Sequence, residues 1–343
     1  MSILCERWHR VLWAALLGLH AHAQTAGTNW PGAPVLGLVS NSEKTEVRPI
    51  QGVPGASTVG DVLPLPAGLG RVYLAPLQQW ALVEPRREQT LGLLPLTGPQ
   101  PGVVTAVYGA MSRPDLVSYS SNGQNAALVS RRSGTLQVLS HLPGTPQVTM
   151  QSDISQLGVV AVAVSDDGLL AAVLTESGGV YLAPPGGSCV LIFRAGSPAG
   201  FTFLLNQEAL AVADGAAGTI TVIQGLNSQP GADSVIAGPN LSGDSLFLQP
   251  SSDGKALILS ANGGQTAYRI DLLDQRVNVL AAPARFSMLE RLNGDMFLFS
   301  ADAGKAAWLL LAGGGDLRVG FAQFTGKPAV RKPVSSLWVD EDR

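Results

Sequence analysis

Few residues of this chain have the side chains that nucleophilic or zinc chemistry requires. A serine–histidine–aspartate triad needs an imidazole to accept the serine proton, and three of the four histidines, His9, His20 and His22, lie in the first 23 residues. The fourth, His141, stands between an expected strand and a Leu-Pro-Gly turn, which favours a surface or packing role. The chain has no G-x-S-x-G or H-E-x-x-H motif and only two cysteines, Cys5 and Cys189. The sequence therefore gives no support to a hydrolase elbow or a zinc site.

Acidic residues offer a second kind of chemistry, because Ca²⁺ and Mg²⁺ bind oxygen ligands and need no histidine. The obvious acids are Asp166, Asp167, Asp253, Asp295 and Asp302. All but Asp302 stand in or beside expected hairpin turns, where Asp is favoured for backbone reasons. We therefore expect turn residues and no cofactor, and a Ca²⁺ or Mg²⁺ site remains the alternative.

Paired arginines form a third pattern. Arg86-Arg87 and Arg131-Arg132 occupy matching points of two consecutive repeats, and Arg113 lies between them in the sequence. These pairs are either solvated turn residues or a docking patch for an anionic partner, such as a carboxylated polymer.

A repeated phrase supplies the elements that position these residues. Each copy is an apolar strand followed by a turn, and the copies recur roughly every 39–46 residues, a period typical of propeller blades. The second strands of the repeats are VLGLVS (35–40), WALVE (80–84), AALVS (126–130), LAAVLT (170–175), ALAVAD (209–214), KALILS (255–260) and DMFLFS (295–300). Asp-Gly, Asn-Gly and Gly-Gly between such runs predict hairpins.

The strand count predicts an all-β fold, a β-propeller of seven four-stranded blades. Complete four-stranded sets begin near Arg71, Asp115, Val159, Phe201, Ser245 and Phe286. Residues 35–65 supply three further strands without an inner one, and VSSLWV (334–339) is one isolated strand. We expect this C-terminal strand to complete the N-terminal blade and remove exposed sheet edges. Six or eight blades, or another β fold, are the alternatives.

Composition and the N-terminus indicate an exported protein. A basic lead, an apolar run over residues 11–19 and an Ala-His-Ala stretch predict a signal peptide at 1–23. The apolar run is too short to span a membrane as a helix. A flexible stretch (24–34), the propeller (35–340) and a tail (341–343) would follow, in the periplasm or outside the cell. Charged residues are only 14% and the net charge is −3, so nucleic acid and anionic membranes are not expected partners. Without Cys5, Cys189 has no disulfide partner, and we expect it to be a buried apolar residue.

The phrase VAVSDDGLLAAVLTESGGVYLA (162–183) resembles secreted bacterial seven-bladed propellers of the YVTN-repeat and lactonase-like kind. The YVTN tetrapeptide and the Trp-Asp pairs of WD40 repeats are absent. The resemblance implies the propeller fold. The alternative function is a lactonase- or lyase-like propeller enzyme that uses acidic residues and a divalent cation at the channel mouth.

In a propeller, the loops that join second to third strands share one face with the loops between blades. The paired arginines should therefore be neighbours on this face. The equivalent turns elsewhere carry Glu176, Asp214, Asn262 and Asp302, so we expect the face to be basic on one side and acidic on the opposite side. The residues expected around the channel mouth are Arg71, Arg113, Asp115, Asp153 and Arg285. The favoured hypothesis is a monomeric, non-catalytic scaffold that binds a protein or polymer through this face.

Overall fold

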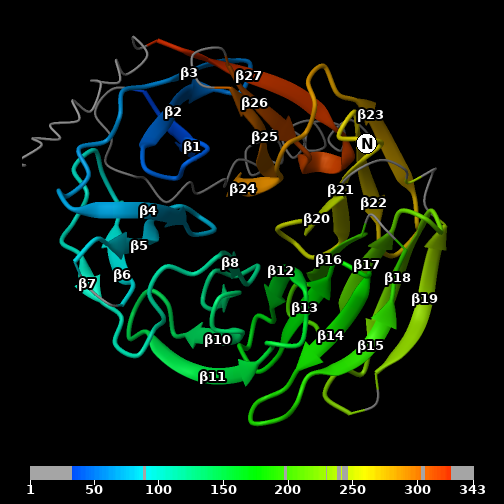
Figure 1. Cartoon of the computed structure of the whole chain (residues 1–343). Helices are drawn as coiled ribbons and strands as arrows, with labels where there is room; N and C mark the ends of the chain where they lie inside the picture. The colour runs from blue at the N-terminus through cyan, green and yellow to red at the C-terminus, as the bar shows by residue number, and fades with distance from the viewer. Residues whose placement is uncertain are drawn as a thin grey trace, which may run out of the picture.

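The structure, a computed structural model, describes residues 33–87, 90–196, 199–228, 230–237, 241, 246–302 and 306–325. The predicted signal peptide, the C-terminal tail, the closing strand at 334–339 and all of the stretch 24–34 except Ala33 and Pro34 lie outside these ranges. The described chain is a ring of β-sheets around a central channel (Figure 1). No helix among the described residues has the length and apolar character needed to cross a membrane.

Six antiparallel sets of four strands, here called blades, follow one another around the ring; five are separate sheets, and the last along the chain is part of a seven-stranded sheet. In each blade the strands lie in chain order, and the innermost strand lines the channel (Figure 1). The first three blades are β4 (Leu69–Leu74), β5 (Trp80–Pro85), β6 (Gly92–Pro95) and β7 (Thr105–Ala106); β8 (Leu116–Tyr119), β9 (Ala126–Ser130), β10 (Thr135–Ser140) and β11 (Gln147–Asp153); and β12 (Val159–Val164), β13 (Ala171–Thr175), β14 (Gly179–Ala183) and β15 (Val190–Arg194).

The next three blades complete the arc toward the C-terminus. They are β16 (Ala199–Phe203), β17 (Leu210–Asp214), β18 (Thr219–Gln224) and β19 (Gly231–Ala237); β20 (Phe247–Pro250), β21 (Ala256–Ala261), β22 (Thr266–Asp271) and β23 (Val277–Ala281); and β24 (Glu290–Asn293), β25 (Met296–Asp302), β26 (Ala306–Leu311) and β27 (Arg318–Phe324), with the 3-10 turn η1 (Gly313–Gly315) before β27. Their starts agree with the six predicted sets, and the predicted all-β propeller fold is confirmed.

A three-stranded unit precedes these blades, as the sequence predicts. It consists of β1 (Val35–Ser40), β2 (Val47–Val53) and β3 (Ala56–Val59), and β1 contacts the inner strands β4 and β24 on either side. The outer strand β3 pairs in parallel with β27, with Ser57 opposite Ala322. The first and last described strands of the ring are thus joined in one sheet by the outer-strand pair β3–β27, which no sequence pattern predicts.

The hydrophobic core lies between neighbouring sheets rather than within one layer. One cluster joins β1 and β2 to the β4 blade through Leu38, Val47 and Val72, and another joins the same unit to the β24 blade through Ile50 and Leu309. Similar clusters fill the other junctions between blades. Burial against both neighbours explains why the second strands read as continuous apolar runs, because both faces of each strand are covered.

Tight turns between the inner and second strands set the register of each blade. Gly168, which follows Asp166-Asp167, has φ 72°, and a Cβ there would lie 2.5 Å from Asn125 Oδ1 in the preceding blade. Only glycine fits this left-handed position without strain. These turns lie at the opposite end of the sheets from the arginine-bearing turns, so the ring has two chemically different faces.

Candidate functional site

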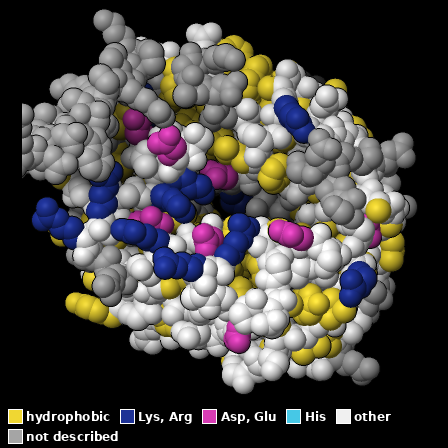
Figure 2. Space-filling view, in the orientation of Figure 1, with side chains coloured by type: hydrophobic (Ala, Val, Ile, Leu, Met, Phe, Trp, Pro, Cys, Tyr) yellow, Lys and Arg dark blue, Asp and Glu magenta, His cyan; other side chains and the backbone are white. Residues whose placement is uncertain are grey.

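The exposed arginines of two adjacent blades gather on one side of the ring. Arg86-Arg87 lies in the β5–β6 turn, Arg131-Arg132 in the β9–β10 turn, and Arg113 in the β7–β8 connection, and all five side chains are exposed. Figure 2 shows basic side chains concentrated over these blades, beside the hollow at the centre of the ring. We call this side, defined by these five residues, the arginine face.

Two of these arginines are fixed by backbone carbonyls, Arg86 by one in its own blade and Arg131 by one in the next blade. The Nε of Arg86 donates to the Leu69 carbonyl at 3.1 Å, and the Nε of Arg131 donates to the Val159 carbonyl at 2.9 Å. Both carbonyls belong to the first residue of an inner strand. Because the tether uses only Nε, the terminal nitrogens of each guanidinium stay available for the two-pronged contact that a carboxylate or phosphate accepts.

The other three arginines carry their charge without a direct partner. Among the residues that the structure describes, Arg87, Arg113 and Arg132 make no ion pair or side-chain hydrogen bond. Arg113 has φ 50°, a left-handed conformation that is uncommon for a residue with a side chain. The arginine face therefore combines two oriented guanidinium groups with three uncompensated ones.

A hydrogen-bonded set of polar side chains lies at the inner rim of this face. Arg71 donates from Nη1 to the Tyr73 hydroxyl and the Pro114 carbonyl, each at 3.4 Å, and the Tyr73 hydroxyl donates to Glu84 Oε1 at 2.6 Å. Burial, and then the Glu84 carboxylate, raise the pKa of Tyr73, so the phenol stays protonated. The hydrogen bond to Tyr73 in turn raises the pKa of Arg71.

The structure brings together three of the five residues predicted at the channel mouth. Asp115 accepts the Arg131 backbone N–H at 2.7 Å, and its neighbour Pro114 accepts from Arg71, so Arg71, Arg113 and Asp115 adjoin the β9–β10 turn. Arg285 instead lies in the β23–β24 connection, against the Gly264 turn, across the ring from these blades.

Asp153 lies at the periphery instead of the channel mouth. It is the last residue of β11, the outermost strand of its blade. Its carboxylate accepts the Ser155 backbone N–H at 2.8 Å, and this bond, followed by one from the Ser155 hydroxyl, lowers its pKa. Periodicity alone did not separate inner from outer strand ends here, because both end in polar residues.

The predicted acidic side of this face is weaker than the sequence suggests. Glu176 is exposed, but the Asp214 carboxylate is buried and accepts the backbone N–H groups of Gly196, Ala216 and Ala217, each at 2.9 Å. The Asp214 carboxylate therefore stabilises the local backbone and is not available to a partner in solvent. The side chain of Asp302 lies outside the described part of the structure.

The opposite face, here called the turn face, uses its polar residues to build its own turns. In three blades a serine donates to the Asp or Asn two residues later, whose Oδ1 also accepts the backbone N–H two residues further on. The pairs are Ser120 with Asn122, Ser165 with Asp167, and Ser251 with Asp253. This recurring Asx-turn confirms the interpretation of Asp167 and Asp253 as turn residues.

Further bonds on the turn face join neighbouring blades. Asp166 accepts the Asn122 N–H at 2.8 Å with one carboxylate oxygen and the Asn206 N–H at 2.9 Å with the other, which ties three consecutive blades together. Asp295 accepts the Ser252 N–H at 2.6 Å. Asp166, Asp167, Asp253 and Asp295 are thus held by backbone donors. The described residues contain no group of three or more His, Cys, Asp or Glu placed to hold a metal ion.

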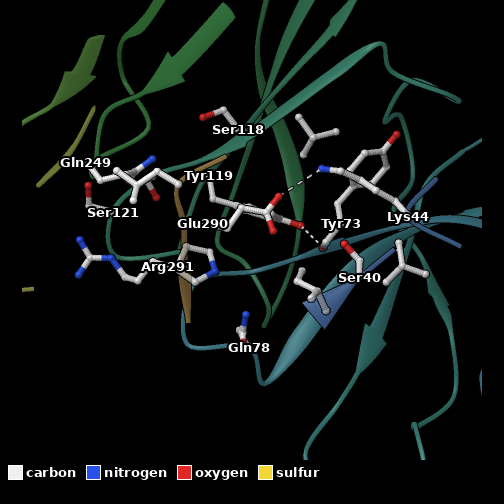
Figure 3. Close-up of a pocket in the computed structure, with 16 residues that line it drawn as sticks. Ser40, Lys44, Tyr73, Gln78, Ser118, Tyr119, Ser121, Gln249, Glu290 and Arg291 are labelled. Carbon is white, nitrogen blue, oxygen red and sulfur yellow. Dashed lines mark hydrogen bonds and ion pairs between the residues drawn. The ribbon is translucent and has the colours of Figure 1, made fainter. Parts of the chain in front are cut away.

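A pocket of about 170 Å³ opens at the hub between β1, β4 and β24 (Figure 3). The Lys44 Nζ lies 3.8 Å from Glu290 Oε1. The same Nζ lies over the Tyr73 ring, 5.4 Å from the ring centre. Gln78 and Ser118 also line the pocket. These residues were not predicted from the sequence. Their one signal there is the Leu77-Gln78-Gln79 turn, which lacks the Asp-Gly or Asn-Gly found in most of the equivalent turns.

The remaining reactive side chains occupy positions that suit packing or solvation. His141 is exposed in the turn after β10. Cys189 is only half-buried, less than predicted, and burial followed by the Asp153 charge raises the pKa of its thiol. A raised pKa lowers the thiolate fraction, so the thiol is a poor nucleophile.

Comparisons with known proteins show the fold. No family model and no curated protein matches the sequence. The crystal structure of a functionally unknown protein from Desulfotomaculum acetoxidans DSM 771 has a TM-score of 0.57 at 14% identity, covering 84% of this chain and 99% of that one. The β-propeller domain of Myceliophteria thermophila Cps50 (Swd1) has a TM-score of 0.53 at 10% identity, covering 75% and 86%. At these identities the likeness is one of fold, which carries no activity with it.

Proposed function

We propose that this protein is an exported β-propeller that acts as a non-catalytic scaffold and binds an anionic protein or polymer through its arginine face. The observation that carries the proposal is the contrast between the two faces. On the turn face Asp166, Asp167, Asp253 and Asp295 are engaged by backbone N–H groups, whereas Arg87, Arg113 and Arg132 on the arginine face have no partner among the described residues. Uncompensated charge of one sign on adjacent turns favours association with a partner of opposite charge.

The side chains available on this face suit binding better than bond breaking. The Tyr73 phenol has a raised pKa and already donates to Glu84, so it is a weak proton donor for catalysis. The arginines are permanently charged and supply attraction without exchanging a proton. The predicted signal peptide supports export, and a partner would accordingly be met in the periplasm or outside the cell.

Removing the unpartnered charges tests this proposal without disturbing internal contacts. We expect Arg87→Ser with Arg132→Ser to weaken binding of fluorescent polyglutamate and polygalacturonate roughly tenfold at low salt, since a tenfold change is only about 1.4 kcal/mol. The weakening should shrink as salt is added, because exposed charges are screened. Anisotropy titrations of the secreted, mature protein measure both effects.

A matched control removes two charges from elsewhere on the ring. Lys255 and Arg276 are exposed and lie on connections at the turn face. Lys255→Ser with Arg276→Ser alters the net charge equally, so it should leave polyanion binding nearly unchanged. Equal losses in the two double variants, or no binding by the wild-type protein, would discard the proposal.

A further inference from the structure

A hollow of about 260 Å³ adjoins the arginine face at the junction of the β8–β11 and β12–β15 blades. It is bounded by the β9–β10 turn, the β11–β12 connection and the β13–β14 turn. The residues that line it and matter here are Arg131, Ile154, Leu157, Gly158, Val159 and Glu176. Arg131 belongs both to this hollow and to the arginine face, so one ligand can engage the two together.

The lining of the hollow combines apolar side chains with two residues of opposite charge. Leu157 is half-buried and extends the apolar surface of the buried Ile154 and Val159. Arg131 comes from the preceding blade and is oriented by its bond to the Val159 carbonyl at 2.9 Å. Glu176 comes from the following blade; it is exposed and its backbone N–H donates to the Gly158 carbonyl at 2.9 Å. The volume is several times the roughly 30 Å³ that one water molecule takes in the liquid, so a side chain can enter.

We propose that this hollow receives an apolar side chain of an acidic polypeptide segment, with a neighbouring acidic side chain against Arg131. The inference rests on the proposed function and narrows it, because it selects protein over polysaccharide. A carboxylated polysaccharide brings repeated charges to the arginines but has no apolar side chain for the hollow. A peptide with acidic and apolar residues complements both features.

Glu176 gives the bound segment a direction. A carboxylate of the ligand is attracted by Arg131 and repelled by Glu176, since like charges at close range disfavour each other. The acidic residue therefore lies on the Arg131 side of the apolar anchor, and the residue on the Glu176 side is neutral or basic. Removal of the Glu176 charge should relieve the repulsion and tighten binding of a uniformly acidic peptide.

Three labelled probes separate this inference from the proposed function. They are a peptide of Glu-Glu-Leu repeats, polyglutamate of the same length, and an oligomer of polygalacturonate, each titrated against the mature protein by fluorescence anisotropy. We expect the Glu-Glu-Leu peptide to bind about tenfold more tightly than polyglutamate, in line with partial burial of one apolar side chain. Leu157→Asn should abolish this difference while leaving polyglutamate binding unchanged, and Glu176→Gln should tighten the peptide severalfold.

The outcomes divide clearly. If all three probes bind alike and depend on Arg87 and Arg132, while Leu157→Asn and Glu176→Gln change nothing, the hollow is not the anchor site and the scaffold function stands. If no probe binds in a way that depends on the arginines, both proposals fall. Should Leu157→Asn reduce thermal stability, the exposed Glu176→Gln variant decides alone: unchanged affinity for the Glu-Glu-Leu peptide overturns the inference.

Discussion

At the scale of single residues, the Gln78 side chain makes the two hydrogen bonds that a neighbouring strand would otherwise make with Leu38 of β1. The Gln78 side chain is buried, accepts the Leu38 N–H at 2.5 Å and donates to the Leu38 carbonyl at 3.0 Å. Leu38 lies opposite Pro49 on β2, which has no N–H to offer, so the polar groups of Leu38 point toward the hub. One amide side chain thereby satisfies both backbone groups at this edge of β1.

Replacing Gln78 by Ala should destabilise the protein by about 1–3 kcal/mol, the usual cost of leaving buried polar groups without partners. Urea unfolding followed by tryptophan fluorescence measures the loss. Gln79, its exposed neighbour in the same turn, supplies the control: Gln79→Ala should lie within about 0.5 kcal/mol of wild type. Similar values for both variants would show that the Gln78 contacts add nothing to stability.

The same contacts bear on the predicted closing strand at 334–339. A strand added along the hub edge of β1 would pair with the Leu38 N–H and carbonyl that Gln78 now holds. Gln78 and that strand therefore cannot both bind Leu38 at once. The segment lies outside the described residues, and the seven-blade count that depends on it stays a prediction.

At the scale of elements, the Ser-x-Asp-Gly turns show how one local rule is used repeatedly. The rule tolerates Asn for Asp, as the Ser120–Asn122 turn demonstrates. In the β20–β21 turn, hydrogen bonds from the Ser251 hydroxyl and then the Lys255 N–H lower the pKa of Asp253. A folded-state pKa below the unfolded value of about 3.9 means that the charged form stabilises the fold above that pH, and that this contribution is lost as pH falls through the folded pKa.

We therefore expect Asp253→Asn to fold normally and to be less sensitive to acid than the wild type. The Asn amide keeps the accepting oxygen but has no proton to bind between pH 5 and 3. Melting temperatures of the two proteins across this range should converge as pH falls, with the wild type losing more. A difference that stays constant with pH would show that the Asp253 charge does not contribute.

These turns and strands are the part of the molecule that the sequence predicts well. Alternating apolar runs and Asp-Gly or Asn-Gly turns are local signals, and they located the six blades within a few residues. The sequence predicts less well which side chains lie together and which point inward or outward. The clustering of Arg71, Arg113 and Asp115 with the paired arginines followed from propeller geometry, whereas the inward turn of Asp214 and the outer position of Asp153 depend on individual hydrogen bonds.

At the scale of the whole molecule, the parallel pairing of β3 with β27 joins the two ends of the described ring. The Ser57 hydroxyl donates to the Phe321 carbonyl at 3.4 Å, and Thr325 donates from both its N–H and its hydroxyl to the Val59 carbonyl. No local sequence pattern predicts this pairing, because each is an outer strand whose partner lies at the far end of the sequence.

A disulfide across this pair should stabilise the ring. Ser57 and Ala322 are register partners and both are buried, so cysteines there, in a background without Cys5 and Cys189, should crosslink on oxidation. A bridge that closes so long a loop restricts the unfolded chain, and we expect a gain of about 2–4 kcal/mol over the reduced form. Urea unfolding with and without reductant measures it. Failure of the cysteines to crosslink would contradict the observed register.

The β3–β27 pair also has a consequence for the order in which the strands pair during biosynthesis. The Ser57–Phe321 contact spans 264 residues, so β3 emerges from the ribosome long before its partner exists. Until then the outer edge of β3 has unpaired N–H and C=O groups that can pair with a strand of another chain. Pairing of β3 with β27 is therefore among the last steps of folding. A product truncated before residue 318 would keep the outer edge of β3 unpaired and open to pairing with other chains, whereas the full-length protein covers it.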